Sequence, residues 1–240
     1  MAALDADVLG LMEIQNNGNS AAQNLVGAVN AVVGTGTYVT TALPVQDTGT
    51  DAIRLAIIYK PLKPSPMGGA VSDTNPLNNR PTLTQTFILG NGERFTLLVN
   101  HIKSKGGCPA AADPNAPGNS NAGDGQGCWN ALRLQQANRL RSFVAERQAP
   151  SGSNDALLIG DLNACAQEDP IFALTSNGYV DQVGRFGSFG YSYAFHGAAG
   201  STTPSPALRC HPASTGCCTG TSMLPRPCCT TTSWRPRHQR

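Results

Sequence analysis

The segment Ala156–Ala164 constrains the fold of this chain more than any other stretch. Its first four residues, Ala156–Ile159, are all apolar, as in a strand that is buried on both faces. Gly160 ends the run, and Asp161 and Asn163 follow directly. Side chains two positions apart on an extended chain point to the same side, so this carboxylate and this amide can bind a hard cation such as Mg²⁺ together. A turn in which both residues only cap nearby backbone groups is the alternative.

The strand predicted over Arg94–Ile102 ends in a second group of polar residues. Asn100 and His101 stand next to each other near its C-terminal end, and Lys103 and Lys105 follow. A single histidine at a strand end is more often structural than catalytic. A histidine beside an amide and two cations, however, offers several donors that suit a phosphate. We interpret this strand end as a second part of a candidate site.

The first predicted strand, Asp7–Ile14, carries Glu13 near its C-terminal end. A carboxylate in an apolar strand is costly to bury unless it is paired or bound to a metal, which makes Glu13 a candidate metal ligand. A glutamate at the strand edge that faces water is the alternative. A helix is predicted to follow up to about Val33. The Pro- and Gly-rich segment Lys60–Asn79 is predicted to be irregular.

Residues 106–127 form a long segment rich in Gly, Pro, Asn, Asp and Ala, and Cys108 and Cys128 stand at its two ends. A loop of this length is unusual unless it is functional or stapled. A disulfide between the two cysteines would close it and implies an oxidising compartment; two free thiols are the alternative. A helix is predicted over Trp129–Gln148, with Trp129 facing inward.

The composition excludes few classes of protein. A chain of 240 residues can form one large domain or two small ones. The formal net charge is only +2, so any contact with nucleic acid must be local rather than due to an overall basic field. The sequence shows no signal peptide, and no apolar run is long enough to cross a bilayer, so no membrane partner is expected.

Several blocks, taken in order, resemble the endonuclease/exonuclease/phosphatase superfamily in its bacterial extracellular nuclease branch. The blocks are residues 7–18, 51–54, 80–81, 100–106, 123–130, 160–164 and 191–193. The resemblance covers about residues 1–200, which are expected to form one partial domain. It implies an α+β fold, a deoxyribonuclease-like two-sheet αβ sandwich, with the site at one end of the sheets.

The resemblance also implies roles for particular residues. Glu13 matches the acid that binds the catalytic Mg²⁺ (or Mn²⁺ or Ca²⁺). His101 matches a histidine that contacts the scissile phosphate, while Asp161 and Asn163 match the pair that orients the attacking water and the phosphate. Asp161 can then accept the proton of that water. The expected substrate-binding residues are Arg80, Asn100 and Lys103.

These roles together imply a secreted, monomeric hydrolase. The expected activity is that of a metal-dependent endonuclease that cleaves phosphodiester bonds of DNA, and RNA is not excluded. A phosphoesterase of the same fold that acts on a lipid or inositol phosphate is the alternative. The family pattern also includes an N-terminal strand with an Asn at the metal site, a Leu-Asp-His-Ala-Leu strand and a Ser-Asp-His-Asp-Pro motif, and this sequence lacks all three. The chain is therefore expected to be truncated at its N-terminus and impaired, and an inactive fragment is the third interpretation.

Residues 201–240 have a composition unlike the rest of the chain. They contain no Asp, Glu, Lys, Ile, Val, Phe or Tyr, and many Ser, Thr, Pro, Arg and Cys, so a disordered or non-native tail without strands is expected. Codons for Gly200–Pro206 can be chosen so that a one-base shift gives Leu-Asp-His-Ala-Leu-Ala. We interpret the tail as an out-of-frame translation; a Cys-rich metal or disulfide tail is the alternative.

Overall fold

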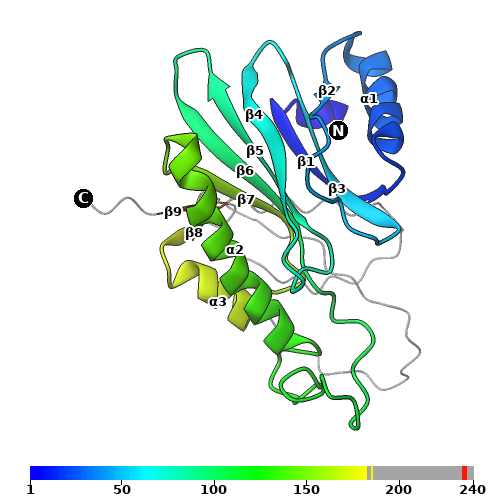
Figure 1. Cartoon of the computed structure of the whole chain (residues 1–240), viewed down its shortest axis with the longest axis vertical. Helices are drawn as coiled ribbons and strands as arrows, with labels where there is room; N and C mark the ends of the chain where they lie inside the picture. The colour runs from blue at the N-terminus through cyan, green and yellow to red at the C-terminus, as the bar shows by residue number, and fades with distance from the viewer. Residues whose placement is uncertain (183–184, 186–233, 237–240) are drawn as a thin grey trace.

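Two β-sheets face each other in the computed structural model, and each carries a helix on its outer face (Figure 1). The structure describes residues 1–182, 185 and 234–236. In this part of the chain the smaller sheet has the order β1-β3-β2 and the larger sheet the order β4-β5-β6-β7-β9-β8. The strands are β1 (Val8–Gln15), β2 (Val39–Thr40), β3 (Ile53–Tyr59), β4 (Pro64–Asp73), β5 (Thr82–Leu89), β6 (Arg94–His101), β7 (Ala156–Asp161), β8 (Tyr179–Asp181) and β9 (Trp234–Pro236). The helices are the 3₁₀ turn η1 (Ala2–Leu4) and α1 (Ser20–Val33), α2 (Asn130–Ser151) and α3 (Asp169–Thr175).

Apolar side chains fill three layers: one between the two sheets, one beneath α1, and one beneath α2 and α3. The central strands are buried on both faces, which explains why their sequences are continuous apolar runs. Alternate residues of a strand point to opposite faces. Leu55 and Ile57 of β3 therefore pack between the sheets, while Ala56 and Ile58 pack beneath α1. In the larger sheet Leu98 faces α2 and α3 instead. The predicted α+β sandwich is confirmed.

Gly10 of β1 allows the two sheets to approach closely. A Cβ atom at this position would overlap the side chain of Ile159 and would lie 2.8 Å from Cγ2 of Val99. Both neighbours belong to the larger sheet, on β7 and β6. The missing side chain therefore lets β1, which carries Glu13 three residues further on, pack against the two strands that carry the other candidate residues.

Three expectations about local structure were wrong. Residues 64–73 are not irregular: they form the edge strand β4, which tolerates its prolines because one side is unpaired, and which bulges between Met67 and Val71. Trp129 precedes α2, with a left-handed φ of 64°, instead of facing inward from the helix. The tail contributes one strand, β9, whose backbone pairs with the open edge of β7 and with β8. The proposed frame change after residue 200 lies outside the described residues.

The long loop between β6 and α2 lies at the lower end of the view in Figure 1. Cys108 and Cys128 form a disulfide with a Cα–Cα distance of 5.3 Å, so this prediction is confirmed. None of the described helices is long and apolar enough to span a membrane.

Candidate active site

The parallel pairing of β6 and β7 brings His101 and Asp161 together. The two strands run side by side in register, with His101 opposite Asp161 at their carboxyl ends. The Nε2 atom of His101 lies 3.9 Å from Oδ2 of Asp161. The imidazole is 6% exposed and the carboxylate 39% exposed. A buried ring thus faces a carboxylate that solvent and substrate can reach.

Gly160 makes this close register possible. Its φ is 127°, in a region that side chains rarely allow. A Cβ atom here would overlap the carbonyl oxygen of Asn100 and lie 2.7 Å from its backbone nitrogen. The glycine before Asp161 is therefore required by the neighbouring backbone.

Asn163 is positioned by a tight turn that Asp161 itself holds. The Asn163 backbone N–H donates to Oδ1 of Asp161 at 2.8 Å, and its side-chain Nδ2 donates to the Ile102 carbonyl at 3.1 Å. The capping turn of the alternative interpretation is thus present. The turn uses only Oδ1 of Asp161, and Oδ2 still faces His101. The turn and the candidate site are therefore compatible.

Glu13 lies on an irregularity of β1. The pairing of β1 with β3 shifts register between Leu11 and Ile14, and Glu13 has a φ of 58°. A bulge of this kind re-aims a side chain out of the regular alternation. Within the described part of the chain, the exposed Glu13 carboxylate forms no hydrogen bond or ion pair.

The electrostatics of His101 show which charges surround it. Burial lowers the pKa of the imidazole, and the positive charge of Arg80 lowers it further. The carboxylates of Asp161, Glu13 and Asp51 raise the pKa, but the net shift is downward. Glu13, Arg80 and Asp161 therefore act on the same ring, which is neutral near pH 7. The Nδ1 atom of His101 is buried and has no hydrogen-bond partner in the described structure.

Arg80 is held beside the site by Asp51, a residue that the sequence interpretation missed. Their ion pair joins Nη2 and Oδ2 at 3.0 Å. The Nε atom of Arg80 is buried and has no hydrogen-bond partner among the described residues. Arg80 thus keeps unused donor capacity next to His101.

The expected contact of Asn100 with substrate is corrected by the structure. Asn100 is 0% exposed. Its Oδ1 accepts a hydrogen bond from Thr82, and its Nδ2 donates to the carbonyls of Leu98 and Ile159. Because these bonds occupy the amide inside the sheet, Asn100 fixes β5, β6 and β7 to one another and does not reach the site. Lys103, in contrast, remains at the surface above the ring of Trp129.

Gln136 of α2 was also missed. Its Oε1 accepts a hydrogen bond from the Lys103 backbone N–H at 2.8 Å, and its Nε2 donates to the Leu77 carbonyl at 2.6 Å and to Oδ1 of Asn79 at 3.0 Å. This buried amide connects the segment before Arg80 with the segment after His101. A polar residue on the apolar face of a predicted helix was the available signal.

A divalent cation fits this site only in part. The described residues contain no group of three or more His, Cys, Asp or Glu side chains that could hold a metal ion. Mg²⁺, however, is commonly bound through one or two carboxylates, with waters and substrate phosphate completing its coordination. The free carboxylate of Glu13 meets that minimum, so Glu13 is the residue that would hold the ion.

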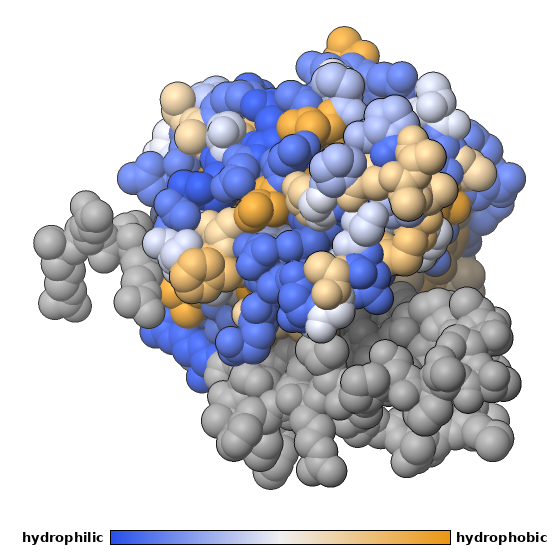
Figure 2. Space-filling model, turned by 90° about the horizontal axis from the view of Figure 1, so that it is seen from below, coloured by the Kyte–Doolittle hydropathy of each residue, from blue (hydrophilic) through white to orange (hydrophobic). Residues whose placement is uncertain are grey.

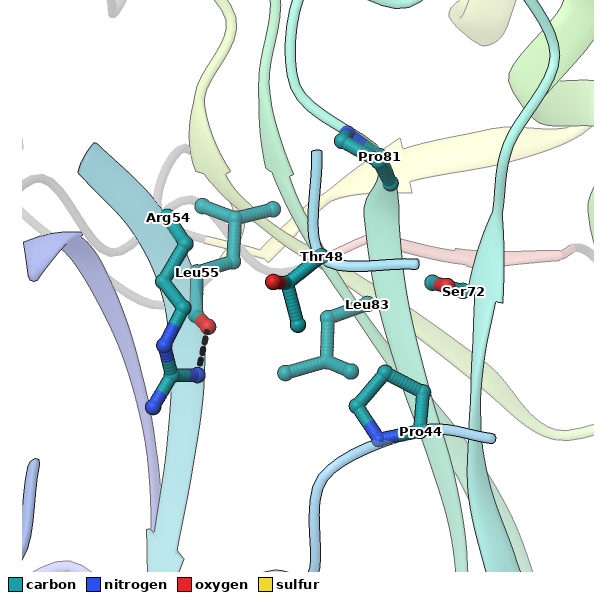
Figure 3. Close-up of a pocket in the computed structure, with 7 residues that line it drawn as sticks. All are labelled: Pro44, Thr48, Arg54, Leu55, Ser72, Pro81 and Leu83. Atoms are coloured by element: carbon teal, nitrogen blue, oxygen red, sulfur yellow. Dashed lines mark hydrogen bonds between the residues drawn. The ribbon is translucent and has the colours of Figure 1, made fainter. Parts of the chain in front are cut away.

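A small pocket lies between β3 and the β4–β5 edge, and Pro81, which follows Arg80, is one of its lining residues (Figure 3). Its empty volume is about 180 Å³, including open solvent. Arg54 lines it but is 2% exposed, and it donates to Gly18 O, Leu55 O and Asn19 Oδ1. Arg54 therefore anchors the turn that follows β1 and gives the pocket no free cation.

This fold, two facing β-sheets with helices on their outer faces, is similar to that of several solved structures. It is similar to the catalytic domain of human Nocturnin at 14% identity, with a TM-score of 0.53 over 98% of this chain and 71% of that one. It is similar to a mannosyl-6-phosphatase of Bacteroides thetaiotaomicron at 14% identity, with a TM-score of 0.51 over 98% of this chain and 72% of the other. An endonuclease/exonuclease/phosphatase family protein from the same bacterium shares 16% identity, with a TM-score of 0.50 over 80% of this chain and 62%, less than two thirds, of that chain. No curated protein matches this sequence.

The family follows from the sequence match. The model of the Endonuclease/Exonuclease/phosphatase family matches residues 1–237, and the chain belongs to this family. Its members hydrolyse phosphoester bonds and generally use divalent metal ions. In this chain His101 and Asp161 lie 3.9 Å apart, and the charge of Glu13 acts on the same histidine.

Proposed function

We propose that this chain is a secreted nuclease that hydrolyses phosphodiester bonds of nucleic acids with the help of a divalent cation. The observation that carries the proposal is the pairing of His101 with Asp161 at the adjoining ends of β6 and β7, with Arg80 and Glu13 acting on the same ring. This arrangement combines a neutral donor, an exposed carboxylate and a cation at one point. These are the groups that a phosphoryl centre under attack by water requires.

The residues can divide the chemistry as follows. The lowered pKa leaves His101 neutral, and because its buried Nδ1 has no described partner, we assign the proton to Nε2. Nε2–H can then donate to a phosphate oxygen. The exposed Asp161 carboxylate accepts the proton of the attacking water, and Arg80 adds positive charge. A divalent ion held by Glu13 would supply further neutralisation of the phosphate.

Two observations favour a secreted nuclease over the lipid-phosphate alternative. The disulfide Cys108–Cys128 suits an oxidising compartment. Figure 2 views the lower end of the molecule, and the described residues there present hydrophilic side chains interspersed with smaller apolar areas. Such a surface suits a hydrated polyanion better than a bilayer.

The test is to incubate the purified chain with plasmid DNA, single-stranded RNA and phospholipid vesicles, each with Mg²⁺ and with EDTA. Metal-dependent cleavage of a nucleic acid is expected, at a reduced rate because the sequence lacks the Ser-Asp-His-Asp-Pro motif of the family pattern. Asp161→Asn should lose at least roughly 100-fold in rate, the usual contribution of a general base. Glu93→Gln, an exposed carboxylate at the other end of β6, is the matched control and should keep its rate. Cleavage of the lipid alone, or no cleavage by the metal-loaded, folded chain, would overturn the assignment.

A further inference from the structure

Trp129 is held at the surface in a backbone conformation that bulky residues rarely adopt. Its φ is 64°, and a bulky side chain in this region is a true outlier. Its backbone N–H donates to the Asn119 carbonyl at 2.7 Å, and its indole Nε1 donates to the Gly107 carbonyl at 2.7 Å. The disulfide at Cys128 adjoins it. Such conformations persist where the surroundings impose them and concentrate at functional sites.

Trp129 is also absent from the apolar core. It belongs to none of the three buried clusters formed by the described residues, and its side chain is only partly buried. The neighbouring helix buries Leu140, Phe143 and Val144 instead. A large aromatic ring that is fixed but not buried leaves apolar surface that a planar ligand can cover.

Lys103 lies over the Trp129 ring and follows His101 by two residues, so it connects the ring with the candidate active site. Its Nζ atom is 4.8 Å from the centroid of the Trp129 ring, a distance typical of a cation–π contact. Burial and the positive charges of Arg133 and Arg80 lower the pKa of Lys103, and no described carboxylate offsets them. Lys105 differs, because Glu168 forms an ion pair with it. Lys103, two residues beyond His101, is therefore a cation that a bound anion would neutralise.

We propose that Lys103 and Trp129 form a subsite for an unpaired nucleotide that flanks the phosphate at His101. Lys103 binds the phosphate of this nucleotide, and Trp129 stacks on its base. The inference rests on the proposed function, since it takes the substrate to be a nucleic acid. Stacking on an aromatic ring tolerates every base but requires that the base be unpaired. The chain is therefore expected to bind single strands in preference to duplexes.

Binding is measured without turnover, by titrating the full chain in EDTA with a fluorescein-labelled ten-nucleotide oligothymidylate and with a duplex of equal length. Wild type should bind the single strand more tightly. Trp129→Leu should weaken that binding by roughly 5- to 150-fold, the range of one base–aromatic stack, and Trp129→Phe by less. Lys103→Gln should reduce the slope of log K against log salt by about 0.7, as for one phosphate contact.

Lys63→Gln removes an exposed lysine in the β3–β4 turn, at the opposite end of β1 from Glu13, and should leave both values unchanged. If circular dichroism shows that Trp129→Leu is unfolded, the binding affinity and salt slope of Lys103→Gln and Trp129→Phe test the subsite instead. Wild-type affinity and salt slope in the folded variants would overturn the subsite. Cleavage of nucleic acid with unaltered binding in these variants rejects the subsite alone. Binding that depends on Trp129 without any cleavage rejects the catalytic proposal alone.

Discussion

His101 is the residue on which the charges of the site converge, and its titration reports their positions. The Arg80 guanidinium lowers its pKa, while the Asp161 carboxylate raises it. Arg80→Gln should therefore raise the pKa of His101, and Asp161→Asn should lower it further. NMR titration of the ring protons in metal-free protein measures both. Equal pKa values in wild type and both variants would show that these side chains do not face the ring.

The same shift predicts how stability depends on pH. Because the folded-state pKa of His101 lies below its unfolded value of about 6.5, the unfolded state binds more protons between the two values. The contribution of this group is thus fully present above pH about 6.5 and is lost as the pH falls through that window. Denaturant unfolding at several pH values, with His101→Gln as the control, should show a weaker acid dependence in the variant.

Gly160 shows at the residue scale how backbone geometry determines the site. A Cβ atom here would overlap the Asn100 carbonyl at a φ of 127°, so Gly160→Ala should lower the free energy of unfolding by about 3 kcal/mol. Gly27 of α1 is the matched control, because nothing lies near its Cβ position. Gly27→Ala should stabilise the helix by about 0.5–1 kcal/mol. Urea unfolding of both variants checks the contrast, and equal effects would contradict it.

At the scale of elements, α2 joins the two polar segments of the site through Gln136. Gln136→Leu leaves the Lys103 N–H and the Leu77 carbonyl without their partner. We expect a loss of about 3 kcal/mol in unfolding free energy, since each buried unsatisfied group costs about 1–3 kcal/mol. The Lys103 amide should also lose its protection from hydrogen exchange. Gln135→Leu, exposed on the same helix, should change stability by less than about 0.5 kcal/mol.

The elements that sequence patterns predicted are those with one strong local signal. The apolar run before Gly160 predicted β7, and the strand predicted over Arg94–Ile102 is β6. The strand β4 was missed because its prolines and glycines suggest a loop, whereas an unpaired sheet edge accepts them. Asn100 was misassigned because a sequence does not show on which face of a strand a polar residue lies. The parallel register of β6 with β7 is a long-range feature that local patterns do not contain.

At the scale of the whole molecule, the loop of residues 106–127 depends on several ties to the sandwich. The disulfide closes it, Lys105 pairs with Glu168, and Gln126 contacts Asp169 of α3. Lys103 and Trp129 flank this loop. An ordered loop should therefore support the proposed nucleotide subsite as well as the stability of the fold. If the protein works outside the cell, the covalent tie is the one that an oxidising environment maintains.

The contribution of that covalent tie can be separated from the others. Replacing Cys108 and Cys128 together by Ser removes a cross-link with a sequence separation of 20, which should lower the free energy of unfolding by about 3 kcal/mol through loop-closure entropy. Because Cys165 is disulfide-bonded as well, a reductant should lower the thermal midpoint of the double variant too, but by less than that of wild type. Because the remaining ties persist in the folded state, the variant should keep its fold and show greater hydrogen exchange in residues 106–127. A reductant that shifts both proteins equally would mean that this disulfide does not stabilise the chain.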